Sequence, residues 1–187
     1  MNQSFFKKGF TLIEILVVMS IISVLAVTLY INFNQAQQGA NDEIRKNGLK
    51  ELQLALKLYK AQYGKYPDQG CGTPGVKWAG PGPMTASWGD SCDEYILGLV
   101  PEFIPALPTD PTREDEDNLG YIYLVASVDS PNDSYKVLVH MSVESKFVTS
   151  YDDEFARCPS ENTNPSCGIT PQKNTYGIYS AGVAEKW

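Results

Sequence analysis

The sequence has little of what catalytic and metal sites are made of. It contains a single histidine, His140, and its four cysteines form no CxxC pair, so the ligand spacing of a zinc site is absent. It also contains no GxSxG nucleophile elbow, no phosphate-binding P-loop and no HExxH metalloprotease motif. We therefore expect no catalytic residues, no bound metal and no cofactor, and the sequence predicts a protein that is not an enzyme.

Positive charge is also scarce. Lys and Arg number 15 against 22 Asp and Glu, which gives a formal net charge of -7. A protein whose main partner is a polyanion carries the opposite balance, so the composition does not indicate nucleic-acid binding. The hydrophobic content of 43% is that of a folded chain rather than a disordered one.

Helix-breaking residues are missing from the first third of the chain. There is no proline between Phe10 and Tyr66, whereas glycine and proline cluster after residue 64. Proline removes a helical hydrogen bond, and glycine raises the entropy cost of a helix. The chain therefore divides into a helical first third and a remainder rich in loops.

Charge is nearly absent from residues 10–31, FTLIEILVVMSIISVLAVTLYI, where Glu14 is the only charged side chain. As a helix this run is about 33 Å long, which matches the roughly 30 Å hydrocarbon core of a bilayer. Lys7 and Lys8 precede the run. The positive-inside rule therefore places them in the cytoplasm and the rest of the chain on the far side of the membrane.

Two simpler explanations of this segment remain open. A secretory signal peptide also has basic residues before an apolar core, but this core is longer than usual and no clean A-x-A site follows it. A plain single-pass anchor explains the length but not Glu14, because a carboxylate inside a bilayer is costly and normally has a partner.

The stretch KKGFTLIEILVV, residues 7–18, resembles the N-terminus of type IV pilins and of the pseudopilins of type II secretion. The resemblance implies that residues 1–9 are a leader, that a prepilin peptidase cuts between Gly9 and Phe10, and that Phe10 is then N-methylated. Glu14 falls where the family has its acid. We expect its carboxylate to meet the Phe10 ammonium of a neighbouring subunit, because an unpaired charge in an apolar core is costly.

This resemblance implies a structural subunit of a type IV pilus, which serves adhesion, motility or DNA uptake. A pseudopilin that builds a periplasmic pseudopilus is the alternative, and a non-assembling, membrane-anchored binding domain is a second. The implied partners are further copies of the chain in a helical filament, a prepilin peptidase/methyltransferase, an assembly ATPase and a platform protein. The subunit would span the inner membrane with an extracytoplasmic C-terminal domain before it enters an extracellular pilus or a periplasmic pseudopilus.

Residues 32–63 are expected to continue the helix as an amphipathic half. Apolar side chains recur there at helical spacing and form one stripe. Its members are Leu49, Leu52, Leu56, Tyr59 and Tyr63, widened by Leu54 and Leu58. Gly64 and then Pro67 mark the end of the helix.

The remainder, residues 64–187, is expected to be an extracytoplasmic domain rich in strands. Apolar runs on either side of the turn-forming DSPND predict a hairpin, and two weaker runs follow it. The four runs are residues 120–128, 134–143, 146–151 and 175–182. The predicted fold class is α+β and pilin-like. A long N-terminal helix with a transmembrane half and an amphipathic half packs on a small antiparallel sheet with disulfide-closed loops.

All four cysteines lie in this domain, at Cys71, Cys92, Cys158 and Cys167. An even number in turn-rich segments indicates disulfides in an oxidising compartment. Three pairings are possible. We favour the sequential one, Cys71 with Cys92 and Cys158 with Cys167, because each bond closes a short loop. Four buried free thiols are the alternative.

The acidic run DPTREDEDNLG, residues 110–120, raises the question of calcium. Asp110, Asp115, Asp117 and Asn118 offer oxygen ligands, and major pseudopilins carry a calcium site in a loop of the C-terminal part. The spacing of an EF-hand is absent, and runs of charge are usually solvated loops. We therefore predict no metal site here.

Overall fold

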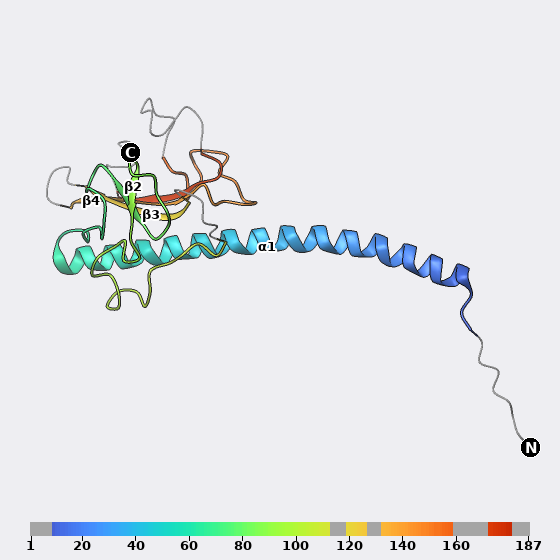
Figure 1. Ribbon diagram of the computed structural model, residues 1–187. Coiled ribbons are helices and arrows are strands. Elements are labelled where there is room, and N and C mark those ends of the chain that lie inside the picture. Colours follow the sequence, from blue (N-terminus) through green and yellow to red (C-terminus); the bar gives the residue numbers. More distant parts are fainter. Residues whose placement is uncertain (1–8, 113–118, 127–131, 159–171, 181–187) are drawn as a thin grey trace, which may run out of the picture. The chain divides into compact units, whose positions relative to one another are not determined.

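The computed structural model describes residues 9–112, 119–126, 132–158 and 172–180 (Figure 1). Two compact units make up the chain, Met1–Gln38 and Gly39–Trp187. The helix α1 spans Leu12–Tyr63. The strands are β1 (Trp78–Gly80), β2 (Gly89–Ser91), β3 (Gly120–Ala126), β4 (Ser134–His140) and β5 (Tyr176–Tyr179).

The end of α1 lies where the sequence predicts it. Gly64 has a φ of 77° and its N–H donates to the carbonyl oxygen of Lys60 at 2.8 Å. Glycine adopts this left-handed conformation without a steric penalty, and its N–H gives one of the last helical carbonyl groups a hydrogen-bond donor. The chain then leaves the helix axis before Pro67.

The strands form one sheet in the order β2-β1-β3-β4-β5. The predicted hairpin is confirmed, because β3 and β4 pair antiparallel from Gly120 opposite His140 to Ala126 opposite Ser134. The predicted C-terminal strand is confirmed as β5, which pairs antiparallel with β4. The turn between β3 and β4 lies largely outside the described residues.

The sheet is mixed and not wholly antiparallel as expected, because β1 and β2 run parallel. Their connection, residues 81–88, begins with Pro81 and Pro83. Proline has no N–H for a ladder, so this segment cannot fold straight back as a hairpin. It returns to the start of β1 instead, where Trp78 N donates to Trp88 O at 3.1 Å.

The strand expected at residues 146–151 is absent. The N–H of Lys146 donates to the Asp42 carboxylate of α1 at 2.9 Å, so this backbone group is not available to a sheet. Val148 is fully buried, and its N–H donates to Lys173 O at 2.9 Å. The apolar residues within 146–151 therefore belong to a loop that buries single side chains, not to a strand.

The second half of α1 lies along one face of the sheet (Figure 1). The predicted stripe is confirmed at its centre, where Leu49, Leu52 and Leu56 are fully buried. The predicted widening is wrong, because Leu54 and Leu58 are 61% and 49% exposed. A helix that packs on a single sheet covers only about 100° of its circumference, so these neighbouring positions are left outside.

Side chains of β3 alternate between two apolar clusters. Tyr121, Tyr123 and Val125 pack with the α1 stripe, whereas Ile122 and Leu124 pack with Trp78 and Leu138 on the opposite face. The strand is buried on both faces, which explains why its sequence is a continuous apolar run rather than a strict alternation.

Candidate functional site

The N-terminal segment of α1 exposes apolar side chains on all sides. The exposed fraction is 83% for Leu12, 67% for Val24 and 69% for Leu29. The helix is long and apolar enough to cross a membrane. So large an apolar surface is not stable in water, and it indicates a lipid or protein environment around this segment.

Glu14 closes a capping box at the start of α1. The backbone N–H and the hydroxyl of Thr11 donate to the Glu14 carboxylate at 3.1 and 3.0 Å. In return, the N–H of Glu14 lies 3.3 Å from the Thr11 hydroxyl oxygen. Two of the four N–H groups that a helix start leaves without partners are thereby satisfied. The sequence carried the signal for this box, Thr-x-x-Glu, but our interpretation of Glu14 considered only a partner in another subunit.

Gly9 and Phe10 lie immediately before the capping box and outside the helix. Phe10 is 82% exposed, and a Cβ placed on Gly9 would meet nothing within 4 Å. Residues 1–8 of the expected leader lie outside the described residues. The Gly9–Phe10 peptide bond is therefore in an exposed segment outside the helix.

The hydroxyl groups within the apolar segment are bonded to the helix itself. Ser20 and Ser23 donate to the carbonyl oxygens of Val17 and Met19, each at 2.7 Å, and Thr28 donates to that of Leu25 at 2.9 Å. A hydroxyl that bonds its own backbone costs little in an apolar environment. These three residues therefore do not oppose burial in lipid.

A buried charge cluster lies at the start of the second unit. Arg45 donates from Nε and Nη2 to Asp110 at 2.9 and 2.8 Å, and its Nη1 lies 3.0 Å from Asp42 and 2.7 Å from Glu144. The Arg45 and Asp42 side chains are fully buried, and Glu144 is 25% exposed. The sequence analysis did not identify Arg45, because a lone arginine on a helix carries no motif.

Asp42 connects α1 to the loop after β4. Its carboxylate accepts the N–H groups of Glu144, Ser145 and Lys146 at 3.0, 2.7 and 2.9 Å. Burial alone raises the pKa of Asp42, but these backbone donors outweigh it and hold the pKa below its ordinary value. The carboxylate is therefore ionised in the folded chain and acts as an anchor for this loop.

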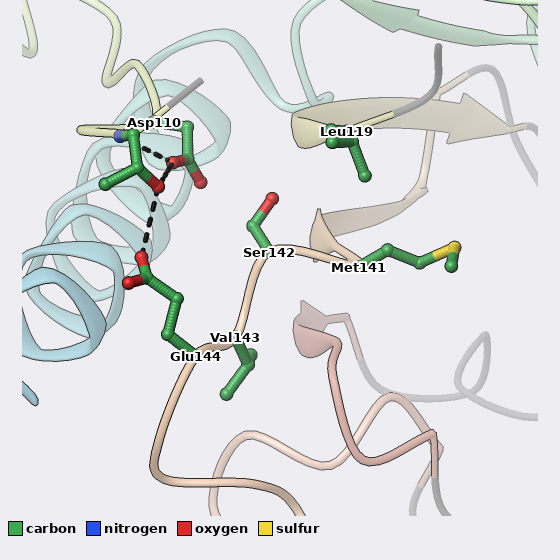
Figure 2. Close-up of a pocket in the computed structure, with 7 residues that line it drawn as sticks. Asp110, Leu119, Met141, Ser142, Val143 and Glu144 are labelled. Atoms are coloured by element: carbon green, nitrogen blue, oxygen red, sulfur yellow. Dashed lines mark hydrogen bonds between the residues drawn. The ribbon is translucent and has the colours of Figure 1, made fainter. Parts of the chain in front are cut away.

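Asp110 and Glu144 point toward each other from two separate segments (Figure 2). They form one side of a pocket of about 420 Å³, and the Thr112 hydroxyl lies 3.2 Å from Asp110 and 3.1 Å from Glu144. Burial raises the pKa of Asp110. The Arg45 guanidinium and the Thr112 N–H together lower it by more than burial raises it, so the pKa is below its ordinary value.

The Asp110 carboxylate is therefore engaged by Arg45 through both oxygens. The other calcium ligands considered from the sequence, Asp115, Asp117 and Asn118, lie outside the described residues. Within the ranges that the structure describes, no three side chains of His, Cys, Asp or Glu come together as a metal would require.

The predicted bond between Cys71 and Cys92 is present. It ties the segment after α1 to the end of β2, where the N–H of Cys92 also donates to Gly80 O at 2.8 Å. Cys158 is disulfide-bonded as well, and its predicted partner Cys167 lies outside the described residues.

Comparison with known families finds one match. Residues 6–30 match the model of the prokaryotic N-terminal methylation motif, which is the signature of type IV pilins and pseudopilins. Neither the curated proteins nor the solved structures contain a significant match to this chain. The resemblance of KKGFTLIEILVV is thereby confirmed, and the range includes Gly9, Phe10 and Glu14. The motif ends before the second unit begins.

Proposed function

We propose that this chain is a structural subunit of a type IV pilus, processed by a prepilin peptidase and assembled through its apolar N-terminal helix. The methylation motif at residues 6–30 is the observation that supports the proposal. The family with this signature is structural rather than enzymatic. The chain is accordingly the substrate of two reactions, cleavage and N-methylation, and the catalyst of neither.

Processing begins at the Gly9–Phe10 bond. Before cleavage, Lys7 and Lys8 keep the leader, residues 1–9, on the cytoplasmic side of the inner membrane. Cleavage then creates an α-amine on Phe10, which is methylated. Phe10 lies two residues before the start of α1, so the new ammonium lies close to Glu14 along the chain.

Assembly moves the exposed apolar surface of Leu12–Ile31 from lipid to neighbouring subunits. In a staggered bundle, the Glu14 carboxylate meets the Phe10 ammonium of the next subunit. A buried pair of this kind sets the register of packing more than it adds stability, because desolvation offsets the attraction. An assembly ATPase and a platform protein would supply the work of extraction from the membrane.

A pseudopilin of type II secretion is the alternative. It shares the N-terminal motif, and the LPTDP segment at residues 107–111, which Arg45 holds through Asp110, resembles that of major pseudopilins. A membrane-anchored domain that never assembles is the second alternative. These three functions differ in where the processed chain is found.

The deciding experiment is intact-mass spectrometry of material sheared from the cell surface, with the N-terminal peptide sequenced. A subunit that begins at N-methylated Phe10 in the sheared fraction supports a surface pilus. A chain that begins at Phe10 but stays in the envelope indicates a pseudopilin. A chain that keeps residues 1–9 would refute membership in either class and leave the anchored domain.

A further inference from the structure

A second pocket lies on the face of the sheet opposite α1, and we name it the Arg157 pocket. It has a volume of about 400 Å³ and is lined by Thr85, Ser87, Trp88, His140, Arg157 and Gln172. The volume falls within the roughly 300–1,000 Å³ of small-molecule sites. The residues come from the β1–β2 connection, the end of β4 and the segment before β5, so tertiary structure alone brings them together.

Arg157 is the charged group of this pocket. Its Nη1 donates to the amide oxygen of Gln172, whereas its buried Nε has no hydrogen-bond partner. Within the part of the chain that the structure describes, no carboxylate pairs with this guanidinium. Burial accordingly lowers the pKa of Arg157. A guanidinium in this position is stabilised by a bound oxyanion, because the oxyanion accepts two parallel N–H hydrogen bonds from the planar guanidinium.

Lys136 is a second basic side chain near Arg157. Burial first, and the charge of Arg157 in addition, lower the pKa of the neighbouring Lys136 to about 7. A second cation is thus costly at this place.

Trp88 provides an aromatic wall beside the guanidinium. Its ring lies 4.6 Å from the His140 ring and 5.9 Å from the Trp78 ring, measured between centroids. These neighbours restrict the indole orientation, and Trp88 remains partly exposed toward the pocket. The negative face of an aromatic ring attracts polarised C–H groups, and the hydroxyl of Ser87 offers hydrogen bonds at the rim.

We propose that the Arg157 pocket binds an acidic saccharide of the uronic acid type. The carboxylate bonds end-on to the Nη groups of Arg157, the C–H face of the sugar ring lies on Trp88, and sugar hydroxyls bond to Ser87 and Gln172. A phosphate would use the guanidinium but not the aromatic wall. A neutral sugar would use the wall and leave the guanidinium without an anionic partner. The proposal does not depend on whether the chain forms a pilus or a pseudopilus.

Calorimetric titration of the full chain with D-glucuronate tests this proposal. The protein is kept in a polyoxyethylene detergent, because alkyl glycoside detergents would bring their own sugars to the pocket. D-glucose and acetate serve as probes for the ring alone and for the carboxylate alone. We expect glucuronate to bind at least about tenfold more tightly than either, since glucose lacks the charge-assisted hydrogen bond and acetate lacks the contact between the sugar ring and Trp88.

Two variants and one control locate the binding. Arg157→Gln is expected to weaken glucuronate binding at least about tenfold. Lys57→Gln, which removes an exposed cation on α1, should leave it unchanged. Ser87→Trp adds bulk at an exposed rim position without disturbing the core and should abolish binding.

Several results would overturn the proposal. These are no heat with glucuronate, equal affinity for acetate, equal affinity for glucose, or undiminished binding by Ser87→Trp. Equal affinity for acetate would mean a simple anion site. Near-ultraviolet circular dichroism of each variant confirms that a loss of binding is not a loss of the fold.

Discussion

At the scale of single residues, Glu14 and Arg45 show two different ways in which a charged side chain finds its partners. Glu14 accepts hydrogen bonds from Thr11 one turn away, so its carboxylate has partners within a single chain. Arg45 is enclosed by three carboxylates from three segments. The first arrangement is local and can be exchanged for another partner, whereas the second requires the folded domain.

The two possible roles of Glu14 can be separated by substitution. Glu14→Gln keeps a side chain that suits a capping box but removes the charge, and we expect filament yield to fall at least about tenfold because the Phe10 ammonium then lies unpaired. Thr11→Ala weakens the cap by about 1 kcal/mol but keeps the carboxylate, so filaments should form. Yield is measured in the sheared fraction, and cleavage at Gly9–Phe10 is the control for insertion. Normal filaments from Glu14→Gln would exclude the ion pair.

Arg45 should be essential for the stability of the second unit. Arg45→Ala leaves Asp42 and Asp110 buried without their counter-ion, and we expect a loss of about 3–5 kcal/mol in the free energy of unfolding. Lys57→Ala, at an exposed site on the same helix, should change it by less than about 0.5 kcal/mol. Urea unfolding of the full chain in detergent measures both. A loss below about 1 kcal/mol for Arg45→Ala would mean that the cluster contributes little.

At the scale of elements, α1 is one helix with two surfaces of different kind. Its N-terminal part is exposed and apolar all round, whereas its C-terminal part buries a narrow stripe that includes Gly48. Glycine normally weakens a helix interior. At Gly48 the missing side chain lets Tyr121 of β3 come close to the helix, where its hydroxyl donates to the carbonyl oxygen of Arg45 at 2.9 Å.

Two glycines of α1 should therefore respond oppositely to the same substitution. A Cβ at Gly48 would clash with the Tyr121 hydroxyl and lie 3.1 Å from Pro108 Cβ, so Gly48→Ala should destabilise the unit by about 1–3 kcal/mol. A Cβ at Gly39 would meet only Ser145 Oγ at 3.9 Å, so Gly39→Ala should stabilise the helix by about 0.5–1 kcal/mol. Thermal unfolding compares them, and a stabilising Gly48→Ala would show that Tyr121 moves aside freely.

At the scale of the whole molecule, stability depends on ionised carboxylates that join segments distant in the sequence. Asp42 holds the loop after β4, and Asp110 holds the segment before β3 through Arg45. Both have a pKa below the ordinary value of 3.8. In acid the unfolded chain therefore binds more protons than the folded chain, and stability rises with pH.

This linkage predicts the acid limit of the fold. The contribution of both carboxylates is fully present above about pH 5 and is lost as the pH falls through their folded pKa values, below 3.8. We expect the urea midpoint to be level from pH 5 to 7 and to fall steeply toward pH 3. Asp110→Asn should start lower at pH 7 and fall less. An equal fall in both proteins would exclude Asp110 as a source of the acid sensitivity.

Local signals in the sequence were sufficient for α1, for its end at Gly64, for the β3–β4 hairpin and for the methylation motif. Each depends on residues close together in the chain, where periodicity, a turn glycine or a short motif is enough. The capping box of Thr11 and Glu14 was also written in the sequence. The strand predicted at residues 146–151 was wrong because Asp42, far away in the chain, takes the backbone N–H of Lys146.

Tertiary structure alone decided which side chains meet. Spacing on α1 placed Leu54 and Leu58 beside the stripe, but both are exposed because a helix that packs on one sheet buries only a narrow arc of its surface. No pattern linked Arg45 with Asp110, or Arg157 with Trp88, since the members of each pair come from separate loops and elements. The sequence by itself determined that α1 is long and apolar enough to cross a membrane, because that depends on one continuous apolar helix. The folded domain determined where charge is buried and where a pocket is left, because both depend on segments that only the completed sheet brings together.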